Sequence, residues 1–321
     1  MEQRAEIIRL ARVFFDSRHY LETDTPLLAP DLIPESCLEV FETMRIPPAG
    51  SRAGAQPYWL IPSPEIWMKK LIAEHRVDIY QICKCFRNGE SAGHLHNPEF
   101  SMLEYYTMDA DYSDSLASTE ELFAYLFENL KLSSISAMPF RRLTVEEAFA
   151  RWAGFDLYDT AASAQAMEGE ARRLGLDPMP GLDVPALYDL IFIHAVEPRL
   201  AGEGLTALLD YPAFVPCLAK KNPDGKTVER WELYANGIEL ANCYSEETNP
   251  AQVRAFFESE AAAKEKSALV RHHVDHDYWK IFQPKNGQGF PRCSGVALGL
   301  DRLIMLLTGH KTIDGVLPFT D

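Results

Sequence analysis

The chain has 321 residues, of which 47% are hydrophobic, so it is long enough to bury a sizeable core. No apolar run approaches the roughly 20 residues of a membrane helix, and no signal-peptide pattern is present, so we expect a cytoplasmic protein without membrane contact. The net charge of −16 disfavours broad binding to nucleic acid phosphates. Six scattered cysteines without a CxxC pair favour reduced thiols over disulfides or a zinc site.

The amino-terminal segment RAEIIRLARVFFDSRHYLETDTPLL predicts a helix and then a strand that ends at Pro26. Residues 5–15 present apolar faces that are too broad for a solvated helix. Further on, IYQICKCF predicts a buried strand, a polar turn follows Arg87, and FSMLEYY predicts a second strand. An arginine on one arm of such a strand pair can bind a phosphate.

The middle of the chain predicts a helix at 116–130 and a mostly helical insert at about 140–205. Strands then return in LTALLDYP, TVERWELYANGIELANCY and CSGVALGL, and the pair Asn236 and Gly237 predicts a hairpin. The histidine-rich stretch RHHVDHDYW has metal-ligand residue types, but we interpret it as a solvated helical face. The predicted fold is a single α+β domain, 1–321, with a mixed, mainly antiparallel sheet flanked by helices.

The last predicted elements are a strand and an amphipathic helix in GVALGLDRLIML. The small residues Gly295, Ala297 and Gly299 alternate along the strand, which lets a ligand approach the backbone closely. Arg302 lies at the start of the helix. Together with Arg87, it predicts an ATP site built from two distant segments.

These two segments resemble motifs 2 and 3 of the class II aminoacyl-tRNA synthetases, and the amino-terminal segment resembles motif 1. More narrowly, YWLIPSPEIWMKKLI, RNGESAGHLHNPEF, MLEYY, WELYANGIELANCYSEE and SGVALGLDRL resemble the lysyl branch. Within that branch they are most similar to the short paralogues that ligate lysine or β-lysine to elongation factor P. The resemblance covers nearly the whole chain and implies ATP, Mg²⁺ and a homodimer. Because the catalytic core uses almost every residue, we expect no anticodon-binding domain and no tRNA acceptor.

The resemblance implies an ATP-binding set. Arg87 would bridge the substrate carboxylate and the α-phosphate, and Arg302 would bind the γ-phosphate and stack on the adenine. Phe100 would cover the other adenine face. Two carboxylates, Glu239 and Glu246, would hold magnesium, which prefers hard oxygen ligands. The full set is Arg87, Glu90, His96, Asn97, Phe100, Glu239, Asn242 and Arg302.

Acidic residues in the predicted amino-acid pocket imply a cationic substrate. Glu65 would receive the α-amino group, while Glu104 and Tyr106, two apart on one strand face, would bind a distal ammonium. The full predicted substrate-binding set is Ser63, Glu65, Glu104, Tyr106, Asn242, Cys243, Glu246, Ala297 and Gly299.

The chain departs from the lysyl pattern at a few positions. Gly89 lengthens the loop before Glu90, His94 replaces an expected basic residue, and Cys243 replaces a glycine beside the pocket. Ala297 stands where lysyl-tRNA synthetases have glycine, which favours the protein-modifying paralogue. Two alternatives remain: a minimal lysyl-type tRNA synthetase or small-molecule amide ligase, and an inactive regulatory paralogue. The chain retains Arg87, Arg302 and the acidic site residues, which argues against the inactive regulatory paralogue.

Overall fold

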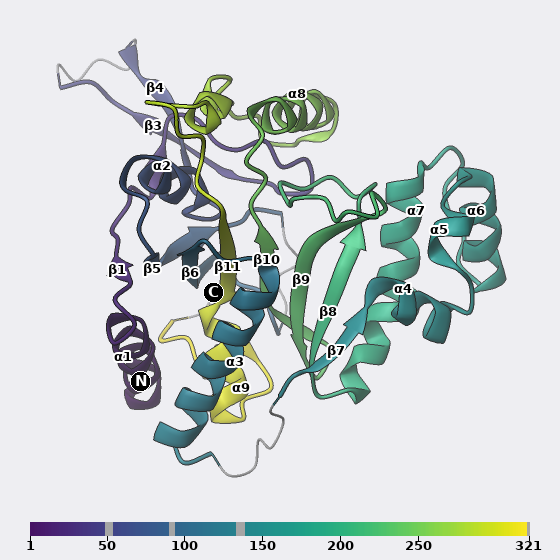
Figure 1. Ribbon diagram of the computed structural model, residues 1–321, viewed down its shortest axis with the longest axis horizontal. Helices are drawn as coiled ribbons and strands as arrows, with labels where there is room; N and C mark the ends of the chain where they lie inside the picture. The colour runs from purple at the N-terminus through teal and green to yellow at the C-terminus, as the bar shows by residue number, and fades with distance from the viewer. Residues whose placement is uncertain (49–53, 90–93, 133–138, 320–321) are drawn as a thin grey trace.

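The computed structural model describes residues 1–48, 54–89, 94–132 and 139–319. Its main sheet has eight strands in the order β1-β5-β6-β11-β10-β9-β8-β7 (Figure 1). Neighbouring strands are antiparallel except for the pairs β1–β5 and β7–β8. This confirms the predicted α+β class. The strands are β1 (Leu21–Glu22), β5 (Ile79–Phe86), β6 (Glu99–Met108), β7 (Arg141–Thr144), β8 (Leu205–Pro212), β9 (Thr227–Ala235), β10 (Ile238–Ser245) and β11 (Cys293–Gly299).

One face of this sheet packs on three helices and forms the main core. These helices are α1 (Glu2–Asp16), α3 (Tyr112–Asn129) and α9 (Leu300–Thr308), which lie together below the sheet in Figure 1. Their apolar stripes bury Phe14, Phe123 and Leu303 in one cluster with sheet residues. The helix predicted at 116–130 is therefore α3. It begins where the Asp111 carboxylate accepts from two backbone N–H groups in a capping box.

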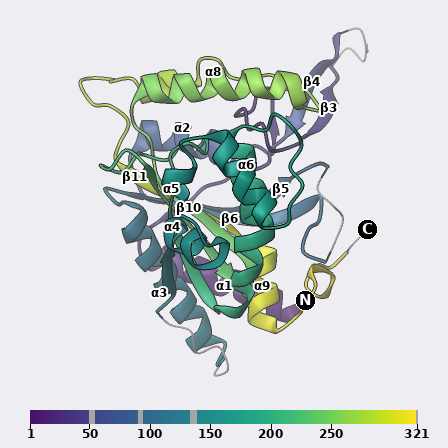
Figure 2. The same cartoon turned by 90° about the vertical axis from the view of Figure 1, so that its right-hand side faces the viewer.

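The opposite face carries α2 (Glu65–His75), α8 (Pro250–Ser267) and the short helix η5 (Tyr278–Phe282). Figure 2 shows α8 running across the top of the molecule. Ile72 of α2, Phe257 of α8 and Tyr278 of η5 share a second buried cluster. These helices wall off the sheet face that bears the candidate site. Within the described ranges, every helix is too short or too polar to cross a membrane.

A smaller sheet with the order β2-β4-β3 lies beside α8. Its strands are β2 (Leu28–Ala29), β3 (Phe41–Arg45) and β4 (Gln56–Leu60). Trp59 is buried there, and its indole N–H donates to the backbone oxygen of Arg271 at 3.1 Å.

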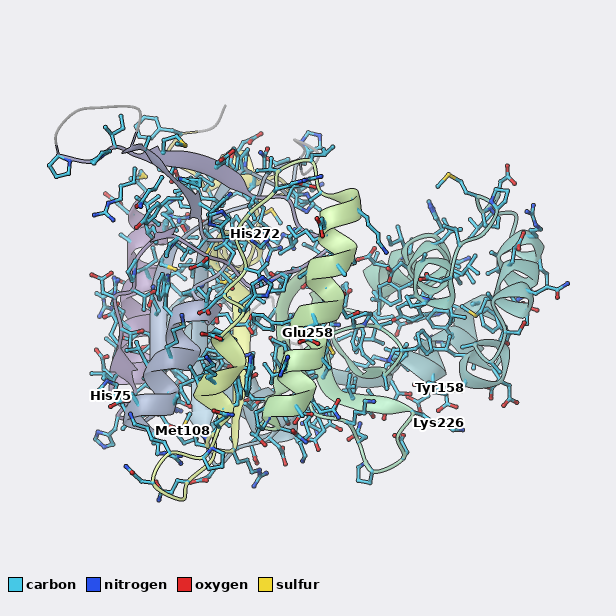
Figure 3. All side chains as sticks on the ribbon, turned by 90° about the horizontal axis from the view of Figure 1, so that it is seen from above. His75, Met108, Tyr158, Lys226, Glu258 and His272 are labelled. Atoms are coloured by element: carbon cyan, nitrogen blue, oxygen red, sulfur yellow. The ribbon has the colours of Figure 1, made fainter. Side chains whose placement is uncertain are left out.

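The expectation that RHHVDHDYW forms a solvated helical face is wrong. Residues 270–277 are not helical, because they are held in an extended course against the small sheet and the loop before it. Val274 forms a β-bridge with Leu32, and the ring of His273 lies 4.9 Å from that of Trp59 in β4. His272 of this loop and Glu258 of α8, both labelled in Figure 3, line an outer cavity of about 890 Å³. In the described part of the chain, no cluster of three or more acidic, His or Cys side chains is suited to a metal ion.

The segment between β7 and β8 is helical and projects from the far edge of the sheet (Figure 1). It buries its own apolar cluster, which includes Phe149, Tyr188 and Leu200. Its elements are α4 (Val145–Ala148), η2 (Phe149–Ala153), α5 (Leu157–Thr160), α6 (Ala164–Arg173), α7 (Val184–Ile191), η3 (Phe192–Val196) and η4 (Glu197–Gly202); a last short helix, η6 (Ile313–Gly315), follows α9.

The predicted hairpin at Asn236 and Gly237 connects β9 to β10. Both residues have positive φ values, 52° and 80°, as the favoured two-residue hairpin turns require. The turn fixes the register, so that Glu232 of β9 faces Asn242 of β10. The hairpin signal in the sequence is thus confirmed.

Candidate active site

A row of paired residues crosses four strands on the sheet face under α2 and α8. Glu104 of β6 pairs with Ala297 of β11, Ala297 pairs with Asn242 of β10, and Asn242 pairs with Glu232 of β9. Directly paired residues place their side chains on the same face of a sheet. The register therefore gathers residues from three distant segments into one site.

Beside this row lies a cavity of about 360 Å³ between the sheet and the loop that carries Glu35 and Cys37. Both predicted phosphate-binding residues, Arg87 and Arg302, line it. The Arg87 guanidinium carbon lies 5.3 Å from the centre of the Phe100 ring. Glu90 lies outside the described residues. The other predicted residues in the wall are His96, Asn97, Glu239, Asn242, Ala297 and Gly299.

Arg302 is held by three groups from two other segments. Its Nη1 donates to the backbone oxygen of Glu239 at 2.8 Å, and its Nε donates to that of Leu95 at 3.3 Å. Its Nη2 lies 2.8 Å from Nε2 of His96. These contacts fix the guanidinium in the cavity wall, so little ordering is needed when an anion binds.

The structure does not support Glu246 as a magnesium ligand beside Glu239. Glu239 is the second residue of β10, and Glu246 directly follows its last residue, so seven residues of nearly extended chain, about 23 Å, separate them and one ion cannot contact both carboxylates. Glu246 instead is buried with its Oε2 at 2.6 Å from the ammonium of Lys69. Of the predicted pair, therefore, Glu239 lines the cavity, whereas Glu246 pairs with Lys69.

Glu232 is one of the carboxylates that share the cavity with Glu239, the others being Glu35 and Asp301. Burial and the charge of Glu232 raise the pKa of Glu239 to about 7, with Arg302 opposing the shift. Glu232 is held by Arg230 at 2.6 Å and by the hydroxyls of Tyr211 and Tyr234 at 2.5 and 2.7 Å. These two acids are also seven residues apart, but across a hairpin, which brings them together. Two such carboxylates facing one cavity fit Mg²⁺.

A second, largely buried cluster lies farther along the same sheet face. The Lys69 ammonium lies 2.5 Å from Glu65 Oε1, which also accepts from the Tyr244 hydroxyl at 3.0 Å. The Tyr106 hydroxyl donates to Glu104 at 2.8 Å. The sequence predicted Glu65, Glu104 and Tyr106 here but missed Lys69. The signal was present, because a lysine four residues after Glu65 sits on the apolar face of that helix.

Two carboxylate oxygens in this cluster, Glu104 Oε2 and Glu246 Oε1, have no hydrogen-bond partner among the described residues. Burial raises the pKa of Glu104 well above its ordinary value and that of Glu246 to about 8, although Lys69 opposes the shift at Glu246. Buried acceptors without donors are costly, and a cationic ligand would satisfy them. The cluster is therefore suited to bind ammonium groups.

Gly295 makes room for this cluster. A Cβ atom at position 295 would lie 2.8 Å from Glu246 Oε1 and would collide with the Tyr106 ring. Any larger residue would push these side chains apart. The glycine thus keeps the tyrosine and the acid in place.

The sequence pattern of the class II tRNA synthetases (D, K and N) matches residues 1–321. The chain belongs to this family. It is 35% identical over 322 residues to "Elongation factor P--(R)-beta-lysine ligase" of Vibrio atlanticus, and the match covers 99% of this chain and 94% of the relative. Proteins of the same name from Photobacterium profundum and Proteus mirabilis are 34% and 33% identical. Those matches also cover 99% of this chain, and 94% and 93% of the relatives.

Cys243, a departure from the lysyl branch of this family, does not border the pocket. Side chains alternate along β10, so Asn242 and Tyr244 face the site and Cys243 faces the helical core. Its thiol is buried 3.3 Å from the hydroxyl of Ser294. The predicted substrate contact is therefore wrong. Ser63 accepts from the backbone N–H of Glu65 at 3.4 Å, and its role in substrate binding remains a prediction.

Proposed function

We propose that the protein is an ATP-dependent ligase that attaches (R)-β-lysine to elongation factor P. The observation that carries this proposal is a buried cluster of carboxylates, with two oxygens lacking donors among the described residues, beside a cavity lined by Arg87 and Arg302. A cationic amino acid and a nucleotide would bind side by side there. The full-length similarity to relatives with that name supports both the acyl group and the acceptor.

The first step would be attack of the substrate carboxylate on the α-phosphorus of ATP. A bond forms between the carboxylate oxygen and phosphorus, and pyrophosphate leaves. Arg87 would neutralise the carboxylate and the α-phosphate, and Arg302 would bind the triphosphate beside the adenine. Phe100 would contact the base. Such a reaction depends mainly on holding the reactants in line and neutralising their charge.

Glu232 and Glu239 would hold Mg²⁺, because they present carboxylate oxygens to the cavity that Arg302 also lines. The ion would supply positive charge to the phosphates. Arg230 offsets part of the negative charge of Glu232 when the ion is absent.

The second step would transfer the acyl group to an amine. The amine nitrogen of the acceptor lysine attacks the carbonyl carbon of the adenylate, AMP leaves, and an amide forms. A net charge of −16 gives little attraction for tRNA, which favours a protein acceptor.

We also propose that the protein acts as a homodimer. Exposed apolar side chains lie along α1 and the first strands, including Val13, Leu21 and Leu28, with Leu21 56% exposed. The strand β1 is also an edge of the main sheet. Apolar patches at such an edge are typical of subunit interfaces.

Pyrophosphate exchange tests the activation step. Purified protein should exchange pyrophosphate into ATP when supplied with (R)-β-lysine or lysine, and should not do so with aspartate or with neutral amino acids. Loss of exchange in a folded Arg87→Ala variant would support the assigned role of that arginine. Absence of exchange with every diamino acid would favour the inactive paralogue.

A further inference from the structure

Lys69 is a buried cation that the proposed reaction does not yet use. Its side chain is 0% exposed, and its ammonium lies between Glu65 and Glu246 and 5.2 Å from the centre of the Tyr244 ring. Lysine is almost never fully buried unless it is paired. Burial lowers its pKa, but the two carboxylates more than offset this effect, so the pKa is raised well above its ordinary value. Lys69 therefore stays positively charged.

The buried ammonium pocket, defined as Lys69 with Glu65, Glu104 and Glu246, contains three carboxylates and one ammonium. Because burial raises the pKa values of Glu104 and Glu246 in the ligand-free protein, the charge count applies to the state with a cationic ligand bound, in which all four groups are charged and two negative charges are in excess. Burial and the charge of Glu65 raise the pKa of Glu35, the next acid toward the cavity, to about 7, and Arg87 and Lys264 oppose this shift. Lysine and β-lysine each carry two ammonium groups. The excess charge of the pocket therefore equals the number of ammonium groups on the proposed substrate.

We propose that Lys69 is a positioning residue that sets the specificity of the pocket for amino acids with two ammonium groups. It neutralises the third carboxylate, which would otherwise be buried without a counter-ion. The Lys69 ammonium also pairs with Oε2 of Glu246. The other oxygen of that carboxylate, Oε1, lies close to Gly295 and the Tyr106 ring, and it remains available to the ligand. The inference rests on the proposed function, because it requires that this pocket bind the amino acid.

A double-variant experiment separates this role from a merely structural ion pair. Glu246→Gln leaves one negative charge in excess, whereas adding Lys69→Met restores two. The readout is the ratio of kcat/KM for pyrophosphate exchange with lysine to that with norleucine, which lacks the distal ammonium. We expect the ratio to fall at least about tenfold in Glu246→Gln and to recover at least about tenfold in the double variant.

The matched control is Glu246→Gln with Lys70→Met. Lys70 neighbours Lys69 on the same helix but pairs with Asp275 outside the pocket, at 2.8 Å. This variant should keep the low ratio of Glu246→Gln. Circular dichroism and melting temperature would establish that each variant is folded, and Lys69→Gln with Glu246→Gln would replace the methionine variant if the latter does not fold.

A double variant that is folded but no more selective than Glu246→Gln would overturn the inference. If Glu246→Gln shows no exchange, recovery of lysine exchange in the double variant supports it and continued loss contradicts it. Wild-type protein that activates no diamino acid would instead refute the proposed function, so the two failures can be told apart.

Discussion

Arg302 donates a hydrogen bond of 2.8 Å to the backbone oxygen of Glu239, whose carboxylate lies 4.0 Å from the same guanidinium. The arginine of α9 and the acid of the β9–β10 hairpin are thus parts of one assembly. We infer that the triphosphate and its metal ion bind between them.

The assignment of the metal ligands predicts different defects in three glutamate variants. Glu232→Gln and Glu239→Gln should each raise the Mg²⁺ concentration needed for half-maximal exchange by about tenfold or more, because each removes a charged oxygen ligand. Glu246→Gln should raise KM for the amino acid and leave the Mg²⁺ requirement unchanged. The control is Glu229→Gln, because Glu229 lies in β9 like Glu232 but pairs with Lys220. A raised Mg²⁺ requirement in Glu246→Gln alone would reverse the assignment.

Gly295→Ala should lower the rate of amino-acid activation by about 10²-fold while ATP still binds. The added methyl group would collide with Tyr106 and crowd Glu246, and displacement of catalytic contacts by about 1 Å can cost about 10²-fold in rate. Exchange kinetics and nucleotide binding would be measured together. Gly169→Ala is the control, since a Cβ there meets nothing within 4 Å. Normal lysine kinetics in Gly295→Ala would show that substrate binding does not require a glycine at this position.

Cys243→Ala should lower stability without altering specificity. The thiol is buried in the helical core, and a small truncation there costs about 1 kcal/mol in the free energy of unfolding. The ratio of α-lysine to β-lysine activation should stay constant, whereas Ala297→Gly, on the site face, should change it. Denaturant unfolding and exchange kinetics provide the two readouts. A changed ratio of α-lysine to β-lysine activation in Cys243→Ala would indicate that the thiol lies beside the substrate.

The ligand-free protein should lose the stability contributed by Glu246 as pH rises from about 4.5 to about 8. Burial raises the folded-state pKa of Glu246 to about 8, above its ordinary value of 4.5, so the folded state holds a proton that the unfolded state has lost. Stability from this group is thus present at low pH and disappears as pH passes the folded pKa. Melting temperature against pH should fall less steeply in Glu246→Gln. Parallel curves for the two proteins would contradict the shift.

The elements of the fold could be predicted because their signals are local. The apolar runs of β5 and β8, and the turn residues Asn236 and Gly237, each specify a strand or a hairpin without reference to the rest of the chain. The loop at 270–277 could not, because its conformation depends on packing against Trp59 from a distant strand.

The errors at the site have one physical cause. Residues close in sequence were expected to share the site, but strand alternation sends Cys243 to the opposite face from Asn242. Likewise, a spacing of seven joins Glu232 to Glu239 across a hairpin yet separates Glu239 from Glu246 along a strand. The paired register decides which residues meet, and it is a property of the assembled sheet.

The most direct test of the account is the fate of the activated acyl group. The protein would be incubated with ATP, Mg²⁺, labelled (R)-β-lysine, elongation factor P and total tRNA from the same cell. We predict that the label enters elongation factor P alone, with the mass increase of one β-lysyl group, and that it resists mild alkali as an amide does. Alkali-labile label on tRNA at a comparable rate, with elongation factor P unmodified, would contradict the account.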